Sequence, residues 1–330
     1  MSGNITVKVS TAFPEWPLSR QTPESSGVWG NCVFVIDRDV KECDYWIVYE
    51  GLTHTQRALC PPENTLLITG EPPSVKTYNS KFIRQFFTVL TCHQDISHPH
   101  IIYKQQGLPW HIGKIYKNSN IGGFRRNYDE LKSIRSFDKH RLLSVISSNK
   151  DWTEGHRNRL DFVRKLTDYF GKDIDVFGKG IRDIEDKWDA IADYKYHIVL
   201  ENGSYIDYWT EKLSDTYLAG AFPIYYGCPN LSDYFAPAAY APIDINNVDA
   251  ALAIVKSTIA HERYEKAIGD LDQARSLVLD KYNFFPMVHD FIVSREMKRN
   301  KEWITLQPEL FLSDSPIKNM FRRFRSAFLR

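Results

Sequence analysis

The stretch that decides the fold is HIVLENGSYIDYWTEKLSDTYLAGAFPIYYG, residues 197–227. It opens with an apolar strand pattern and a polar loop, continues with helix-forming residues from Thr210 to Ala219, and ends in a second apolar strand pattern at Phe222–Tyr226. A strand, a helix and a strand at this spacing predict a right-handed crossover within a parallel sheet. Such sheets bind ligands beyond the carboxyl ends of their strands, so we expect the polar loop to contribute to a binding site.

The same alternation extends along the second half of the chain, whereas the first half shows short apolar strands between polar turns. In the second half, further strands are expected at Leu143–Ile146, Ile174–Phe177 and Pro242–Ile245, and helices at Gly155–Phe170, Ile184–Asp193 and Val248–Arg263. In the first half, strands are expected at Ile5–Val9, Val33–Ile36, Trp46–Val48, Leu66–Thr69, Phe87–Leu90 and Ile101–Tyr103. Gly107–His140 is rich in glycine and basic residues, and we expect it to connect two domains.

The composition is that of a globular protein with two domains. The chain has 330 residues, of which 43% are hydrophobic and 25% charged, and it exceeds the size that one hydrophobic core usually supports. Its net charge of +1 gives no field that would attract nucleic acid. The five cysteines form no CxxC pair, which favours a reducing compartment. The sequence has no signal-peptide pattern and no apolar run of ~18 residues, so we expect a cytoplasmic protein.

Lys212 stands in the first turn of the helix expected at Thr210–Ala219. The partial positive charge of a helix N-terminus disfavours a cation there, whereas the free amide groups favour an anion. A lysine and free amide groups together would suit a diphosphate. The alternative is a surface lysine paired with a nearby carboxylate such as Asp215, and the residues alone leave both interpretations open.

The order of motifs in this region resembles the signature of the α-1,3-fucosyltransferases of glycosyltransferase family 10. The signature comprises Glu-Asn at 201–202, Tyr-Trp-Thr-Glu-Lys at 208–212 with tryptophan in place of the usual valine, and Ala-Gly-Ala-Phe-Pro-Ile-Tyr-Tyr-Gly at 219–227. The resemblance implies an α/β protein of two Rossmann-like domains facing a cleft, which is the B-type glycosyltransferase fold. Residues 1–138 would bind the acceptor and include the linker, and residues 139–312 would bind the donor. The implied reaction transfers L-fucose from GDP-fucose to a glycan acceptor with inversion.

The resemblance also implies which residues bind the donor. Five of them lie in the signature itself: Asn202, Tyr208, Thr210, Glu211 and Lys212. A further donor residue would be an arginine at the start of the helix after Leu143–Ile146. The apolar residues that follow it place Arg159 at that position, with Arg157 as the alternative. An arginine fork grips phosphate oxygens in two places, which a lysine does not do. The plainer interpretation of both arginines is a solvated helix face.

Glu71 is the expected catalytic base. Thr69-Gly70-Glu71 follows an apolar strand, and members of the family carry a Gly-Glu pair at the matching strand end. The reaction needs a carboxylate near the acceptor hydroxyl, and burial in a cleft would raise its pKa towards neutrality. The alternative is an ordinary turn glutamate before Pro72-Pro73.

No metal site or cofactor is expected. Asp37-Arg38-Asp39 has the pattern that holds a cation on some sugar donors, but it lies in the half assigned to the acceptor. Cys92, His93, His98 and His100 crowd together without a standard zinc spacing. The family does not depend on such a motif, and Arg159 and Lys212 would supply the positive charge, so manganese or magnesium is expected at most to stimulate the reaction.

Residues 313–330 form the last distinct segment, a basic amphipathic tail. Apolar residues recur at helical spacing among cations: Ile317, Met320, Phe321, Phe324 and Phe328 alternate with Lys318, Arg322, Arg323, Arg325 and Arg330. This pattern is typical of a helix lying on an anionic membrane, here the inner face, where a lipid-linked glycan would be the acceptor. The alternative is a helix packed on the protein body. Two rival functions remain: the same fold with another nucleotide sugar, and a non-catalytic carbohydrate-binding protein.

Overall fold

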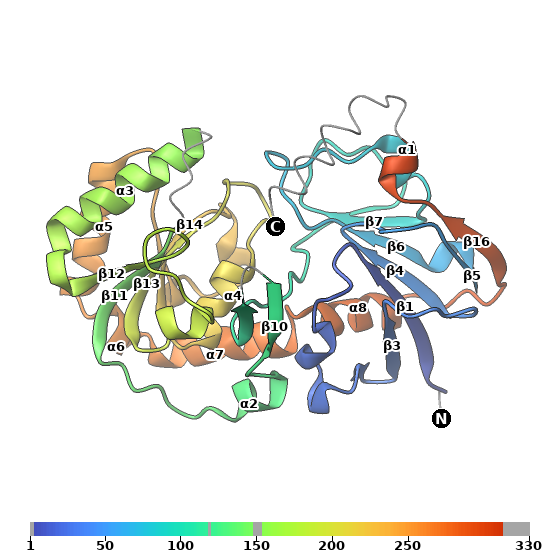
Figure 1. Cartoon of the computed structure of the whole chain (residues 1–330), viewed down its shortest axis with the longest axis horizontal. Helices are drawn as coiled ribbons and strands as arrows, with labels where there is room; N and C mark the ends of the chain where they lie inside the picture. Colours follow the sequence, from blue (N-terminus) through green and yellow to red (C-terminus); the bar gives the residue numbers. More distant parts are fainter. Residues whose placement is uncertain (1–2, 118–119, 148–153, 313–330) are drawn as a thin grey trace. The chain divides into compact units, whose positions relative to one another are not determined.

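The computed structural model describes residues 3–117, 120–147 and 154–312, which form two compact α/β units (Figure 1). Within these residues, the first unit comprises 3–106, 120–121 and 284–312. The second unit comprises 107–117 and 122–283. Each unit is built on a largely parallel sheet, which confirms the prediction of two Rossmann-like domains.

The first unit contains a seven-stranded sheet in the order β2-β3-β1-β4-β6-β7-β8. Its strands are β1 (Ile5–Thr11), β2 (Val28–Trp29), β3 (Cys32–Ile36), β4 (Tyr45–Tyr49), β6 (Thr65–Ile68), β7 (Thr88–Thr91) and β8 (Ile101–Tyr103). Only the pair of β2 and β3 is antiparallel. Every residue of β4, β6 and β7 is buried, as expected where both faces of a parallel sheet are covered. The six strands predicted in this half are therefore confirmed.

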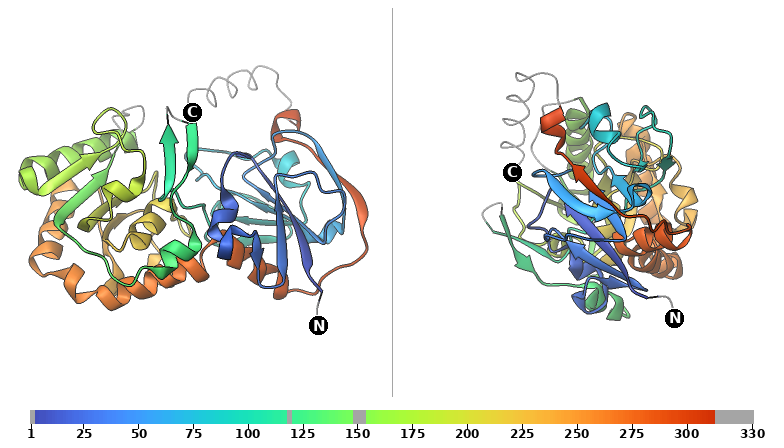
Figure 2. Two further views of the ribbon diagram at one scale, coloured as in Figure 1. Left: turned by 60° about the horizontal axis from the view of Figure 1, so that its bottom comes forward. Right: turned by 90° about the vertical axis from the view of Figure 1, so that its right-hand side faces the viewer.

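The C-terminal part of the described chain returns to the first unit. Helix α8 (Phe284–Val293) packs aromatic rings against the sheet, with the Phe285 ring centroid 4.9 Å from that of Phe34. Strand β16 (Glu302–Leu306) then pairs antiparallel with β5 (Gln56–Cys60) (Figure 2). The second unit thus ends at Asn283, and not at the predicted residue 312, because this aromatic helix completes the core of the first unit.

The second unit contains a five-stranded, wholly parallel sheet in the order β12-β11-β13-β14-β15. The strands are β11 (Arg141–Ile146), β12 (Ile174–Phe177), β13 (Tyr194–Leu200), β14 (Phe222–Tyr226) and β15 (Ala241–Pro242). The helices are α3 (Glu154–Phe170), α4 (Glu211–Leu218), α5 (Val248–Ala260), α6 (Arg263–Lys266) and α7 (Ile268–Asp280). From β11 the chain crosses to β12 on one side, and from β13 it crosses to β14 on the other. The topological switch point therefore lies between β11 and β13.

Four predicted elements differ in the structure. The strand expected at Pro242–Ile245 is reduced to β15, Ala241–Pro242. The helix expected at Ile184–Asp193 is only a 3-10 turn, Lys187–Ala190. The segment expected to be a linker contains the hairpin of β9 (Lys114–Lys117) and β10 (Asn120–Phe124), followed by α2 (Tyr128–Ser133). The last predicted helix ends at Ala260, before a residue in the left-handed region at 262. Nowhere in the three described ranges is a helix long and apolar enough to cross a bilayer.

The small-residue turn of the signature has a steric cause. Gly220 follows α4 with φ of 67°, and a Cβ there would lie 2.2 Å from the ring of Phe137. The left-handed conformation and the missing side chain together require glycine at the helix end. The turn brings the chain directly from α4 into β14.

Candidate functional site

The switch point of the second unit joins two predicted site residues. Arg159 lies in the first half of α3, which follows β11, and Asn202 lies two residues after β13. The Arg159 guanidinium donates a 3.1 Å hydrogen bond to the Asn202 side-chain oxygen. Burial lowers the pKa of Arg159, but arginine stays charged at neutral pH. Open α/β sheets bind their ligands at this position.

The loop after β13 closes on itself through Glu201 and Thr210. Glu201 is 1% exposed, and its carboxylate accepts hydrogen bonds from the Thr210 amide at 2.8 Å and the Thr210 hydroxyl at 2.7 Å. Thr210 is also the N-cap of α4 and accepts a bond from the Lys212 amide. Tyr208 is buried in the same loop, with its ring edge-on to that of Tyr205. The Glu-Asn pair and the Thr-Glu-Lys sequence are thus one folded unit.

Lys212 lies between two carboxylates. Its ammonium group is 3.3 Å from Glu201, 3.3 Å from Glu211 and 3.1 Å from the Thr210 hydroxyl. Burial alone would lower the pKa of Lys212, but attraction to Glu211 and Glu201 raises it above the ordinary value. The lysine is therefore firmly charged, and 28% of its side chain is exposed. Asp215, the partner that the sequence suggested, pairs with a different lysine.

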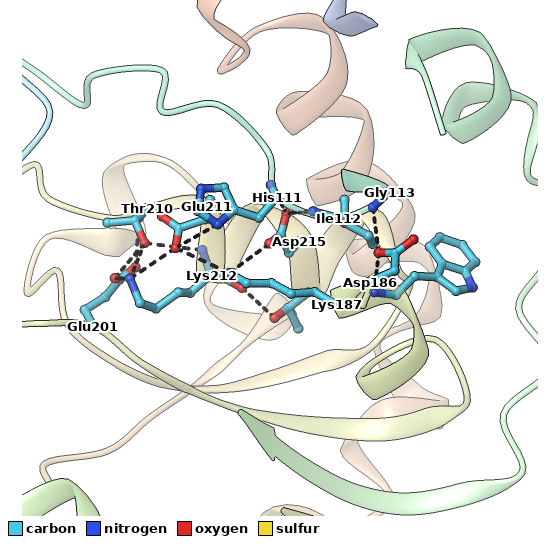
Figure 3. A network of polar contacts seen from close by, with 12 residues as sticks. His111, Ile112, Gly113, Asp186, Lys187, Glu201, Thr210, Glu211, Lys212 and Asp215 are labelled. Atoms are coloured by element: carbon cyan, nitrogen blue, oxygen red, sulfur yellow. Dashed lines mark hydrogen bonds and ion pairs between the residues drawn. The ribbon is translucent and has the colours of Figure 1, made fainter. Parts of the chain in front are cut away.

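That second lysine is Lys187, in the 3-10 turn before β13. Its ammonium group lies 3.4 Å from both Glu211 and Asp215 (Figure 3). The other oxygen of Asp215 accepts bonds from the backbone amides of His111 at 3.0 Å and Ile112 at 2.9 Å. Burial and the nearby Lys187 hold the pKa of His111 well below its usual range, so its ring is neutral at pH 7.

Glu211 is the centre of this cluster. Burial by itself would raise its pKa, but the positive charges of Lys212 and Lys187 hold the pKa well below its ordinary value. Lys187 and His111 were missed by sequence reasoning because each reaches the cluster from a segment with no recognisable motif. Figure 3 shows both converging on α4 from outside the signature.

A cavity of about 70 Å³ opens beneath the cluster. It is lined by Lys187, Lys212, Asp215 and the buried His197, together with apolar residues of β11 and β13. Ligand-binding pockets usually measure ~300–1,000 Å³, so this cavity does not itself accommodate a nucleotide sugar.

Glu71, the predicted base, lies in the first unit, three residues after the end of β6. Its backbone amide lies 3.3 Å from the Glu50 carboxylate, and its carbonyl oxygen is 2.7 Å from Nε2 of His93. The backbone on both sides of the Glu71 side chain is thereby fixed. Among the predicted donor residues, the second unit brings together Arg159, Asn202, Thr210, Glu211 and Lys212. The Arg157 side chain and the tail at 313–330 lie outside the described residues.

The histidines and aspartates considered for metal binding have other contacts. His93 and His98 each contact a backbone carbonyl through Nε2, and Asp37 accepts two bonds from Thr11. Within 3–117, 120–147 and 154–312, no group of three or more His, Cys, Asp or Glu side chains is arranged to hold a metal ion.

Comparison with known proteins agrees with the site. Residues 137–262 match the family model described as glycosyltransferase family 10 (fucosyltransferase) C-term. A bovine α-(1,3)-fucosyltransferase 4 is 36% identical over 115 residues, covering 32% of this chain and 27% of that protein. An α-(1,3)-fucosyltransferase of Helicobacter pylori is 29% identical over 96 residues, covering 27% of this chain and 20% of that protein. The matched part thus spans about a quarter of these relatives.

Two solved structures are similar to this chain over most of its length, at lower sequence identity. A crystal structure of an α1,3-fucosyltransferase with GDP-fucose has a TM-score of 0.47 and 16% identity, covering 81% of this chain and 82% of that one. A crystal structure of an α1,3-fucosyltransferase with GDP has a TM-score of 0.49 and 14% identity, covering 86% and 94%. Residues 137–262, which run from β11 to α5 and contain the signature, thus resemble the C-terminal domain of the fucosyltransferases of glycosyltransferase family 10.

Proposed function

We propose that this protein transfers L-fucose from GDP-fucose to a glycan acceptor and inverts the anomeric carbon. The observation that carries the proposal is the charged cluster at the switch point, where Lys212 is held between two carboxylates beside the Arg159–Asn202 pair. The match of residues 137–262 to the family model of the fucosyltransferases supports the choice of fucose as the transferred sugar.

The donor would be held through its diphosphate. Arg159 and the exposed part of Lys212 supply positive charge where negative charge grows as GDP departs. Donors positioned in this way are each worth ~2.7–4 kcal/mol of barrier. The amide groups at the N-terminus of α4 favour the same anion. Glu211, whose low pKa keeps it ionised, would accept hydrogen bonds from the ribose hydroxyls, and Tyr208 would line the nucleotide.

The acceptor would be activated by Glu71. Its carboxylate takes the proton of the acceptor hydroxyl while that oxygen forms a bond to the anomeric carbon. The bond between the anomeric carbon and the phosphate oxygen breaks on the opposite face, and its electrons leave with GDP. This step needs no metal ion, since the positive charge comes from side chains. The basic tail at 313–330 would hold the enzyme on the inner membrane surface, near a lipid-linked acceptor.

The experiment that tests the proposal is a panel of nucleotide sugars. The protein is incubated with GDP-fucose, GDP-mannose, UDP-galactose and UDP-N-acetylglucosamine, and donor hydrolysis and transfer to a panel of glycans are measured. We expect turnover with GDP-fucose and little with the others. Turnover with another donor would show that the transferred sugar is not fucose, while the proposed glycosyl transfer would stand. No turnover with any donor, together with binding of free glycans, would identify a carbohydrate-binding protein instead. In the same assay, Glu71→Gln should lose transfer but retain GDP affinity.

A further inference from the structure

We infer that Glu50, at the end of β4, is a positioning residue that fixes Glu71 for its role as the base. The inference rests on the proposed function. Glu50 is 5% exposed and has a φ of 65°, a conformation that residues other than glycine adopt rarely. Strained backbone of this kind in a buried polar residue is concentrated at functional sites.

The Glu50 carboxylate accepts hydrogen bonds from the segment that contains Glu71. One oxygen accepts hydrogen bonds from the backbone amides of Gly70 at 2.5 Å and Glu71 at 3.3 Å, and from the Tyr78 hydroxyl at 2.5 Å. The other oxygen is 2.6 Å from the Lys76 ammonium group. Burial and the neighbouring carboxylate hold the pKa of Tyr78 well above its usual range, so its hydroxyl keeps the proton that it donates.

The glycine of the Gly-Glu pair is explained by this contact. A Cβ on Gly70 would lie 2.8 Å from the Glu50 carboxylate oxygen and 3.2 Å from the Tyr49 hydroxyl. The missing side chain therefore lets the carboxylate reach the backbone amides beyond β6. The two residues of the Gly-Glu pair therefore act together. Because Gly70 has no side chain, the Glu50 carboxylate can bind the backbone amide of Glu71.

Glu50 contacts the backbone amide of Glu71, and a second residue contacts the backbone carbonyl oxygen of Glu71. His93, after the neighbouring strand β7, bonds the carbonyl oxygen of Glu71. The peptide groups on both sides of the Glu71 side chain are thus tied to adjacent strands of the sheet. A general base must lie within hydrogen-bond reach of the proton that it takes, and a shift of 1 Å in a reacting group lowers the rate by ~100-fold.

The test is Glu50→Gln in the full chain. The amide oxygen can still accept from Gly70 and Tyr78, but the amide nitrogen would face the Lys76 ammonium group, so the segment shifts. We expect kcat for transfer to fall by ~10–100-fold, with GDP affinity and the KM for GDP-fucose unchanged. The double variant Glu50→Gln/Lys76→Met removes the ammonium group that would face the new amide nitrogen. It should therefore recover most of kcat. Asp37→Asn is the matched control, since Asp37 also follows a strand, has a φ of 49° and accepts backbone and hydroxyl bonds, but from Thr11.

Action through the base is tested by combining variants. If Glu50 acts by positioning Glu71, then Glu50→Gln should cause no further loss in a Glu71→Gln background. Equal fold losses in both backgrounds, or wild-type kcat in folded Glu50→Gln, would overturn the inference alone. Normal transfer by Glu71→Gln would overturn the assigned base and the inference with it. Should Glu50→Gln not fold, Tyr78→Phe removes one donor and leaves the ion pair. It should lower kcat by a smaller factor, and wild-type kcat there would count against the inference.

Discussion

Lys212→Met is the sharpest test of the charged cluster, because it separates stability from donor binding. The substitution leaves Glu201, whose side chain is fully buried, facing Glu211 without the intervening ammonium group. Removing one partner of a buried ion pair destabilises a protein by about 3–5 kcal/mol. Two bonds from Thr210 to Glu201 and the contact of Lys187 with Glu211 remain. We therefore expect the lower end of that range, about 3 kcal/mol.

A domain of 150–250 residues loses ~2–4 °C of melting temperature per kcal/mol, so Lys212→Met should lower the melting temperature of the second unit by about 6–12 °C. A hydrogen bond to a charged group contributes ~1.5–3 kcal/mol, so the affinity for GDP should fall by about 10–100-fold. Thermal unfolding is followed by calorimetry, and GDP affinity by titration calorimetry at a temperature where the variant is folded.

The double variant Glu201→Gln/Lys212→Met distinguishes the two effects. It removes the unpaired buried charge, so most of the melting temperature should return, while GDP affinity should stay low because the cation is still missing. Wild-type GDP affinity in the double variant would refute the assignment of Lys212 to the diphosphate. An unchanged melting temperature in the single variant would refute the account of the ion pairs.

Three further results are expected. Arg159→Lys keeps the charge but loses the two-pronged guanidinium group and its bond to Asn202, so GDP affinity should fall about tenfold. Arg157→Lys should have little effect on GDP affinity. A larger loss of affinity in Arg157→Lys than in Arg159→Lys would identify Arg157 as the donor residue. Lys139 donates to two backbone carbonyls, and burial lowers its pKa to about 7 from 10.5. The unfolded state therefore binds more protons between these pH values, and the free energy of unfolding should gain up to ~1.4 kcal/mol per pH unit. Urea unfolding of Lys139→Met from pH 7 to 10 should lack that rise, and an identical slope would refute the shift. Truncation before Ser315 should abolish binding to anionic vesicles and leave transfer to a soluble acceptor unchanged, and that transfer should also persist in the presence of a chelator. A lower melting temperature with unchanged vesicle binding would instead indicate a tail packed on the protein body.

The strands were predictable because a parallel sheet covered on both faces requires continuous apolar runs. Such runs stand out at β4, β6 and β13, where nearly every residue is buried. The error at Ile184–Asp193 has an equally local cause. The Asp186 carboxylate is fully buried and accepts bonds from the amides of Gly113 and Trp188 and from the Arg126 side chain. These partners hold the segment as a short 3-10 turn, and two of them, Gly113 and Arg126, flank a distant hairpin that the sequence pattern did not reveal.

The residues of the candidate site also fall into two groups, those that could be predicted from the sequence and those that could not. Residues inside the signature could be found because they follow one strand and cap one helix. Lys187 and His111 could not, since only the folded sheet brings the turn before β13 and the segment before β9 onto α4. Lys187 pairs with Glu211 and Asp215, and the backbone amide of His111 donates to Asp215. The side chain of Lys187 is 19% exposed, against 28% for Lys212.

The carboxylates of the cluster account for a lysine at a helix N-terminus, where the helix dipole disfavours it. Glu201 and Glu211 hold Lys212 charged and in one position before any ligand binds. In the proposed function, an incoming diphosphate would meet a cation that needs no reorganisation, which is the condition under which electrostatic stabilisation of a departing group is largest. In the first unit, Glu50 does the corresponding work for Glu71 by means of an anion that binds backbone amides. In both units a buried carboxylate that follows a strand, Glu201 or Glu50, contacts the segment that carries a charged side chain at the carboxyl edge of a parallel sheet. In the second unit, Glu211 of α4 adds a second carboxylate.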